Sequence, residues 1–139
     1  MPGVPDEERV RVDPAIVVTA AVIERDGRFL VTRRQQGVHL EGFWEFPGGK
    51  CGEGEPLEVC LARELREELD VDARIGDEMF SVTHTYVDRR VELHFFRCDI
   101  AGEPRPQVGQ AMQWVTRGEL ADLEFPEADA ELIELLGTT

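Results

Sequence analysis

Hydrophobic residues cluster and alternate along the chain in a way that predicts its strands and helices. The near-continuous apolar run at 15–24 (AIVVTAAVIE) is typical of a strand buried on both faces. Asp26-Gly27 is a hairpin turn signal, and the segment 28–33 (RFLVTR) is the expected partner strand. A short strand at 43–46 leads into a loop at 45–50 (EFPGGK), which proline and two glycines interrupt. The first fifty residues therefore predict strands that end in a glycine-rich loop.

The rest of the chain adds helices to this pattern. A helix is predicted at 56–69, strands at 73–86, 90–100 and 111–115, a helical turn at 118–123, and an amphipathic helix at 126–136. Strands and the two main helices interleave without strict β-α-β alternation, so we expect an α/β fold with a mixed sheet and one helix on each face. The 139 residues predict one domain at 14–139, preceded by a flexible N-terminal arm at 1–13.

Three glutamates in the helix at 56–69 have a spacing that indicates chemistry. Glu64, Glu67 and Glu68 fall at i, i+3 and i+4, which places them on one helix face, close enough to share a cation. A charge run is usually a solvated face. Much of the apolar content of this helix, however, lies within roughly 60° of Glu64 at 100° per residue. Carboxylates beside an apolar stripe are costly without partners, and a hard dication such as Mg²⁺ is the natural partner.

The stretch 49–71 (GKCGEGEPLEVCLARELREELDV) resembles the sequence box of the Nudix family, G-x5-E-x7-R-E-U-x-E-E-x-G-U, where U is a bulky aliphatic residue. One position departs, because Asp70 stands where the box has its late glycine. We expect Asp70 to end the helix as a left-handed cap, a conformation that aspartate tolerates better than most residues. The matching residues are Gly49, Glu55, Arg63, Glu64, Leu65, Glu67, Glu68 and Val71.

The resemblance covers most of the chain and is strongest toward MutT-type nucleoside triphosphate pyrophosphohydrolases. It implies an α/β/α sandwich with a mixed central sheet and two main flanking helices. It also implies Mg²⁺-dependent hydrolysis of nucleoside triphosphates to monophosphate and pyrophosphate, with Mn²⁺ able to substitute. In this reaction type the protein mainly positions groups and stabilises charge.

The same resemblance implies roles for residues in and around the box. The expected catalytic residues are Glu64, Glu67 and Arg63. Glu64 would bind metal or accept the proton of the attacking water, and Arg63 would orient Glu55 or the carboxylate cluster. The expected metal ligands are the backbone carbonyl of Gly48 and the carboxylates of Glu64, Glu67 and Glu68.

Substrate contacts are predicted on both sides of the box. Arg34 and Lys50 are expected to bind phosphate, although a solvated charge at a strand end would look the same in the sequence. Asp129, Phe46 and Tyr86 are expected to form the base pocket, although aromatic residues on strands are more often core. A first-turn acid such as Asp129 is also favoured by the helix dipole alone. An ionised aspartate only accepts hydrogen bonds, so it would favour bases that present N–H donors.

A second departure concerns the loop at 101–110. Relatives often carry a further metal-associated glutamate in this loop, where the present chain has Val108. The sequence holds no carboxylate between Glu103 and Glu119. A mechanism that needs an acid from this loop would therefore require Glu103 to reach the site.

Composition limits the partners. The net charge of −14 disfavours nucleic acid, so a triphosphate would bind only where local cations outweigh the global field. No window of about 20 apolar residues predicts a membrane span, and the polar, acidic start is unlike a signal peptide. The odd number of cysteines, three, without zinc-ligand spacing, fits structural thiols in a reducing cytoplasm. We expect a cytoplasmic monomer or weak homodimer.

Several substrates remain open at this point. An oxidised guanine triphosphate, 8-oxo-dGTP, is the leading hypothesis because of the MutT-like match over the whole chain. The aspartate at 129 fits a cytosine nucleotide equally well, so CTP, dCTP or a modified dCTP is the alternative. A nucleotide sugar or a dinucleoside polyphosphate would keep the same chemistry. A non-catalytic nucleotide-binding module is the third hypothesis, and the intact glutamate set argues against it.

Overall fold

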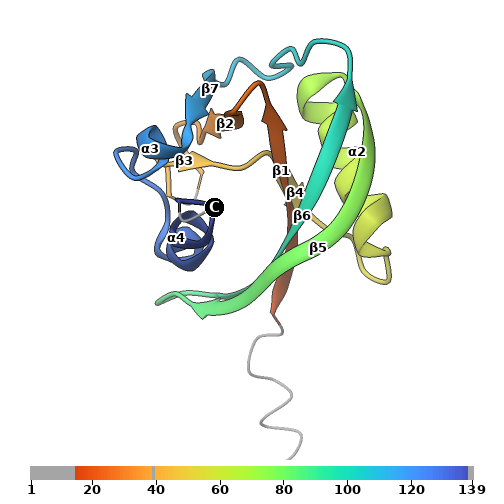
Figure 1. The fold of residues 1–139 in the computed structure, drawn as a ribbon. Helices are drawn as coiled ribbons and strands as arrows, with labels where there is room; N and C mark the ends of the chain where they lie inside the picture. The colour runs from red at the N-terminus through yellow and green to blue at the C-terminus, as the bar shows by residue number, and fades with distance from the viewer. Residues whose placement is uncertain (1–14, 39, 138–139) are drawn as a thin grey trace, which may run out of the picture.

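A mixed β-sheet organises the part of the chain that the structure, a computed structural model, describes: residues 15–38 and 40–137 (Figure 1). The arm predicted at 1–13 lies outside the described residues. The strand order is β3-β2-β1-β6-β5, with β4 paired to β1 and β7 paired to β2. The strands are β1 (Ile16–Arg25), β2 (Arg28–Arg33), β3 (Trp44–Glu45), β4 (Gly48–Lys50), β5 (Asp72–Thr85), β6 (Arg90–Ala101) and β7 (Met112–Thr116). The helices are α2 (Leu57–Leu69), α3 (Arg117–Leu120), the 3₁₀ turn η1 (Glu127–Asp129) and α4 (Ala130–Gly137).

Strand β1 lies in the middle of the sheet and is buried on both faces, as its apolar run predicts. Successive side chains of a strand point to opposite faces. Ala20 and Val22 therefore join one core cluster, which includes Leu132 of α4. Ala21 and Ile23 join the other, which includes Leu61, Leu65 and Leu69 of α2. Helices α2 and α4 lie on opposite sides of the sheet (Figure 1), which confirms the predicted sandwich.

The glycine-rich segment differs from the sequence prediction, because part of the expected loop forms strand β4. Thr19 of β1 pairs with Gly49 in an antiparallel register. A Cβ on Gly48 would stand 2.0 Å from the carbonyl oxygen of Thr19, so only glycine permits this approach. The alternation of antiparallel bonds turns the backbone groups of Gly48 and Lys50 away from β1. The pairing therefore fixes the direction in which the Gly48 carbonyl points.

Asp70 ends helix α2 in the left-handed conformation, with φ 55° and ψ 45°, and its N–H donates to the Arg66 carbonyl. This confirms the cap predicted at the position where the Nudix box has glycine. Glycine would adopt the same angles without a Cβ penalty. The aspartate also places a negative charge at the negative end of the helix dipole.

Asp70→Gly is therefore expected to raise the free energy of unfolding by about 0.5–1 kcal/mol. Asp70→Ala removes the charge but keeps the Cβ, so it separates the two causes. Urea denaturation of the three proteins measures the difference. Equal stability of the Gly and Ala variants would show that the left-handed backbone carries no cost here.

Candidate active site

A cavity of about 430 Å³ opens between the β1–β4 pair, the face of α2 and the segment that holds η1. Most of the predicted site residues line it, although they come from segments far apart in the chain. These are Arg34, Phe46, Gly48, Lys50, Glu64, Glu68, Tyr86 and Asp129. Glu55, Arg63 and Glu67 are not among its lining residues. The structure thus divides the predicted set into a group that faces the cavity and a group behind it.

The carboxyl groups of Glu45, Glu64 and Glu68 all line the cavity, and their pKa values are raised. Burial, with the nearby Glu45 and Glu64 carboxylates, raises the pKa of Glu68 to about 8. Burial also raises the pKa of Glu64 and of Glu45, although arginine partners oppose this in both cases. Sequence reasoning did not assign Glu45 to the site. The signal was present in its place on a short strand, two residues before Pro47 and the two glycines.

The donor set of the cavity fits a hard cation. Glu64 and Glu68 present carboxylate oxygens, and the backbone of Gly48 faces away from β1 beside them. Oxygen ligands and a concentration of negative charge are what Mg²⁺ requires. Glu67 fits less directly, because its side chain is 58% exposed and its Oε1 accepts from Arg63 Nη1 at 3.2 Å. The metal role of Glu67 stays a prediction that requires its side chain to turn.

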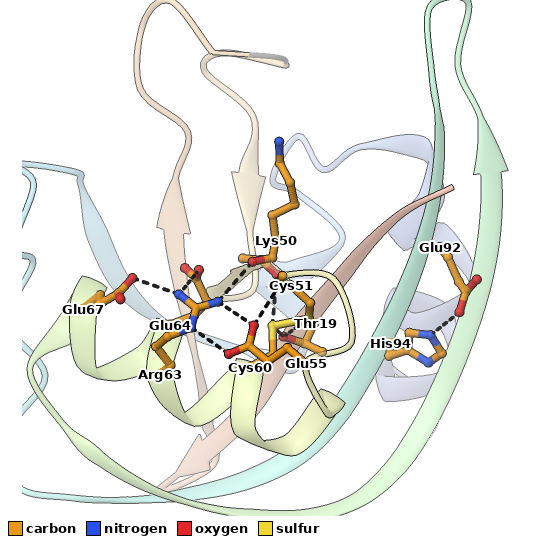
Figure 2. The surroundings of a disulfide bond; sticks show 12 residues. Thr19, Lys50, Cys51, Glu55, Cys60, Arg63, Glu64, Glu67, Glu92 and His94 are labelled. Atoms are coloured by element: carbon orange, nitrogen blue, oxygen red, sulfur yellow. Dashed lines mark hydrogen bonds and ion pairs between the residues drawn. A yellow bond between two sulfur atoms is a disulfide. The ribbon is translucent and has the colours of Figure 1, made fainter. Parts of the chain in front are cut away.

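Arg63 connects the parts of the box behind the cavity (Figure 2). Its Nε and Nη2 donate to the two carboxylate oxygens of Glu55 at 2.9 and 3.0 Å. Its Nη1 donates to Glu64 at 2.9 Å as well as to Glu67, and Nη2 also reaches the Lys50 carbonyl at 3.3 Å. A planar guanidinium matches such a set of acceptors. Arg63 therefore fixes Glu64 relative to β4 without lining the cavity.

Glu55 completes this arrangement from the loop before α2. Its Oε1 accepts from the Gly52 backbone N–H at 2.9 Å. The hydrogen bonds from Arg63 and then from Gly52 lower the pKa of Glu55 to about 2. The carboxylate is thus a charged anchor for Arg63.

The two consecutive arginines that follow β2 differ in their surroundings. Arg34 lines the cavity, and its Nη1 donates to Glu45 at 2.7 Å. Arg33 instead donates from Nε to the Gly42 carbonyl at 2.9 Å and lies 6.0 Å from the Trp44 ring centre. Lys50 is exposed at the cavity rim. The structure therefore places Arg34 and Lys50, but not Arg33, where they could meet an anion in the cavity.

Asp129 also lines the cavity and is only 4% exposed. It ends the 3₁₀ turn η1 rather than standing in a solvated first turn of the last helix, as the alternative interpretation would have it. Burial, with the nearby Glu45 charge, raises the pKa of Asp129 to about 7. The premise of a fully ionised aspartate is therefore corrected, because near neutral pH this carboxyl is present in both forms.

Two aromatic residues line the same cavity as Asp129. Burial and the Asp129 charge raise the pKa of Tyr86, which is half-buried. Phe46 is 3% exposed and stacks on Phe125 with ring centres 5.4 Å apart. Phe46 therefore belongs to the core and to the cavity wall at once. Arg89, in the turn between β5 and β6, also lines the cavity and was not identified from the sequence.

The loop before β7 brings no acid into the cavity. Glu103 pairs with Arg25 at 3.0 Å, and its side chain is 77% exposed. Val108 lines a smaller neighbouring hollow beside Glu68. Glu45 is instead a further carboxylate of the cavity, close enough to Glu68 for its charge to raise the Glu68 pKa.

Comparisons with known proteins agree with this geometry. The NUDIX domain family matches residues 18–135. The chain is 36% identical over 120 residues to the CTP pyrophosphohydrolase of Escherichia coli, covering 86% of this chain and 89% of that protein. It is 34% identical over 127 residues to the 8-oxo-dGTP diphosphatase of Haemophilus influenzae, covering 89% and 93%. A structure of MutT from Aliivibrio salmonicida and Vibrio cholerae superposes with a TM-score of 0.75 at 27% identity, covering 89% and 97%.

The chain belongs to the NUDIX family, and it is a hydrolase of the MutT type. Members of this family generally use a divalent metal ion and act on nucleotide substrates. Among the helices of the described residues, none has the length and hydrophobicity needed to cross a membrane.

Proposed function

We propose that this protein hydrolyses nucleoside triphosphates to the monophosphate and pyrophosphate, with Mg²⁺ as the metal and Mn²⁺ as a substitute. One observation carries the proposal: a single cavity holds an acidic cluster, basic groups for phosphate and a polar group suited to a base. Glu64 and Glu68 form the cluster, Arg34 and Lys50 are the basic groups, and Asp129 is the polar group. These groups match the parts of a metal-bound nucleotide: the metal ion, the phosphates and the base.

The metal would be held by the Gly48 carbonyl and the carboxylates of Glu64, Glu67 and Glu68. Bound there, it would neutralise the phosphate oxygens and help activate water. Side chains of the protein would bind the phosphates, accept the proton and hold the reacting groups in position. Arg34 and Lys50 would hold phosphate, and Glu64 would accept the proton of the attacking water. The hydrogen bonds of Arg63 to Glu64 and to Glu55 support a role of Arg63 in keeping Glu64 in position. Arg63 is thus a positioning residue in this proposal.

The proposed base is the oxidised guanine of 8-oxo-dGTP, with a cytosine nucleotide as the second candidate. Relatives of similar identity carry the names 8-oxo-dGTP diphosphatase and CTP pyrophosphohydrolase. The buried carboxyl of Asp129 favours the second candidate as much as the first, because both bases present N–H donors. Tyr86 and Phe46 would enclose the ring. We further propose a cytoplasmic protein that acts as a monomer or weak homodimer and, because of its acidity, without nucleic acid.

A substrate panel tests this proposal. 8-Oxo-dGTP, dGTP, CTP, dCTP, UTP, a nucleotide sugar and a dinucleoside polyphosphate are each incubated with Mg²⁺, and both products are identified. The proposal predicts a monophosphate and pyrophosphate, with 8-oxo-dGTP giving the highest kcat/KM. Release of inorganic phosphate, or a nucleotide sugar as the best substrate, would contradict it.

We expect base choice to depend on pH through Asp129. Its raised pKa, about 7, means that the carboxyl is protonated below and ionised above that value. The protonated form can donate to O4 of uracil, whereas the ionised form only accepts, as the 4-amino group of cytosine requires. The ratio of kcat/KM for CTP over UTP should therefore rise between pH 6 and pH 8.

The variant Asp129→Asn is the matched control, since an amide does not titrate in this range. Its CTP/UTP ratio should stay flat with pH, and its ratio between 8-oxo-dGTP and dCTP should differ from that of the wild type. If Asp129→Ala changes neither ratio nor either rate, Asp129 does not face the base.

Arg34→Ala is expected to lower kcat/KM by about tenfold to a hundredfold for every nucleotide alike, because charge-assisted phosphate contacts carry no base identity. Arg33→Ala is the neighbouring control and should change kcat/KM much less, since Arg33 bonds to Gly42 outside the cavity. Steady-state kinetics on four bases measure both. A shift in base preference in Arg34→Ala would contradict the phosphate assignment.

A further inference from the structure

Two of the three cysteines form a disulfide beside the helix face that carries Glu64. Cys51 directly follows β4, and Cys60 lies in α2, one turn before Glu64. Their Cα atoms are 5.4 Å apart and their sulfurs form a disulfide (Figure 2). The sequence predicted structural thiols and no such bond. The loop that the bond closes contains Glu55, the anchor of Arg63.

The disulfide lies where two parts of the proposed metal site meet. Gly49, two residues before Cys51, packs so closely on α2 that an added Cβ would stand 2.1 Å from Glu64 Oε1. Cys60 shares the helix face of Glu64 at i, i+4. The bond therefore ties the strand that carries Gly48 to the helix that carries Glu64, at the point of their contact.

We propose that Cys51 and Cys60 form a reversible dithiol–disulfide site, oxidised by a hydroperoxide and reduced by a dithiol, whose oxidised form binds the metal ion more tightly. The proposal rests on the metal site proposed above. A thiophilic metal bound by Cys51, Cys60 and Glu55 is the competing interpretation, because the Glu55 carboxylate lies near both sulfurs. The structure supports it less well. The Glu55 carboxylate is already held by Arg63 and Gly52.

The exposure of the two sulfurs sets the order of the chemistry. Cys51 is half-buried, whereas Cys60 is fully enclosed, so the Cys51 thiolate meets the peroxide first. It attacks one peroxide oxygen; the S–O bond forms, the O–O bond breaks, and an alcohol or water leaves with the thiol proton. The Cys60 sulfur, as thiolate, then attacks the Cys51 sulfur and forms the S–S bond. The S–O bond breaks, and the sulfenic hydroxyl leaves as water with the proton of the Cys60 thiol. Two thiols of the reductant reverse the reaction and become a disulfide.

Reduction is expected to move β4 rather than α2. Two thiol sulfurs need a van der Waals separation well beyond the roughly 2 Å of a disulfide. Cys60 cannot withdraw, because it is fully buried and its Sγ lies 3.3 Å from Thr19 Oγ1. The displacement therefore falls on Cys51 and, two residues before it, on Gly49, which contacts Glu64. Loosening this contact lowers the preorganisation of the oxygen ligands and weakens metal binding.

Cys98 provides an internal control. It is buried in the core on the α2 side of the sheet, and burial raises the pKa of its thiol to about 12. A thiol that is rarely ionised reacts slowly with peroxide. Hydroperoxide is therefore expected to act on the Cys51–Cys60 pair and to leave Cys98 unmodified.

The test uses the full chain without nucleotide. Protein reduced with dithiothreitol is treated with hydrogen peroxide, alkylated and digested, and the Cys51–Cys60 linkage is read by peptide mass. Mn²⁺ binding to the oxidised and reduced forms is then measured by titration calorimetry. We expect the linked peptide to form and the Kd for Mn²⁺ to rise about fivefold or more on reduction.

Two variants accompany the wild type. Cys51→Ala/Cys60→Ala should bind Mn²⁺ like the reduced wild type under both conditions, whereas Cys98→Ala should respond like the wild type. Absence of the linked peptide would overturn the proposal, and so would a linked peptide with equal Kd values. If neither form binds Mn²⁺, the proposed metal site itself is wrong, and the peptide mass still reports separately whether the cysteines pair.

Discussion

Glu68→Gln is expected to lower kcat by about a hundredfold or more at saturating substrate, which corresponds to a loss of at least about 2.7 kcal/mol of transition-state stabilisation. The carboxyl of Glu68 is half-buried in the cavity, and burial together with the charges of Glu45 and Glu64 raises its pKa to about 8, so a bound cation would favour its ionised form. An amide keeps the shape of the side chain but removes the charge that would hold the metal. Glu67→Gln is expected to lower kcat as well, through the metal role proposed for it.

Two controls separate loss of the metal from loss of the fold. Glu58→Gln changes an exposed glutamate of the same helix and should leave kcat and its Mg²⁺ dependence unchanged. In chelator without metal at neutral pH, Glu68→Gln should melt at a higher temperature than the wild type, because it removes a carboxyl whose pKa rises to about 8 on folding and which therefore costs stability above its ordinary pKa. Wild-type activity should vanish in excess chelator and return with Mg²⁺ or Mn²⁺. Full activity in chelator would overturn the mechanism.

Arg63→Lys is expected to lower kcat by about tenfold to a hundredfold while KM changes little. A lysine ammonium cannot bond both oxygens of Glu55 and also reach Glu64 and the Lys50 carbonyl, as the guanidinium does. Glu64 would then lose its fixed place relative to β4, and misplacement of a reacting group by about 1 Å can cost a hundredfold in rate. KM is spared because Arg63 does not line the cavity.

Arg66→Lys is the matched substitution for this experiment. Arg66 lies in the same helix, is exposed, and pairs with Asp72 rather than with the box. It should leave kcat and KM near the wild-type values. If Arg63→Lys instead raises KM and preserves kcat, Arg63 contacts the substrate directly and is not a positioning residue.

The sequence by itself determined those features that depend on near neighbours in the chain. The near-continuous apolar run at 15–24 correctly predicted a strand buried on both faces, and its successive residues from Ala20 to Ile23 join the two core clusters in turn. The spacing of Glu64, Glu67 and Glu68 predicted that they lie on one face of a helix. The position of Asp70 predicted that this helix ends in a left-handed cap. The family resemblance added the sandwich, because the box occurs in that fold.

Only the tertiary structure decided which of these residues face the cavity. Helical spacing put Glu64, Glu67 and Glu68 on one face, but packing against β4 turned Glu64 and Glu68 inward and left Glu67 58% exposed. The close approach of Gly49 to Glu64 is a contact with the helix that no periodicity within the helix encodes. Pairing with the distant strand β1 is also why part of the loop predicted at 45–50 forms strand β4.

Contacts between segments far apart in the chain also determine the pKa of Asp129 and the pairing of Cys51 with Cys60. Asp129 lies more than 80 residues from Glu45, yet the charge of Glu45 and burial together set its pKa. Cys51 and Cys60 meet because β4 packs on α2, and their spacing alone did not indicate a bond. Local patterns report which face of an element is apolar; the pKa of a buried group depends on charges and surfaces that only long-range packing brings together.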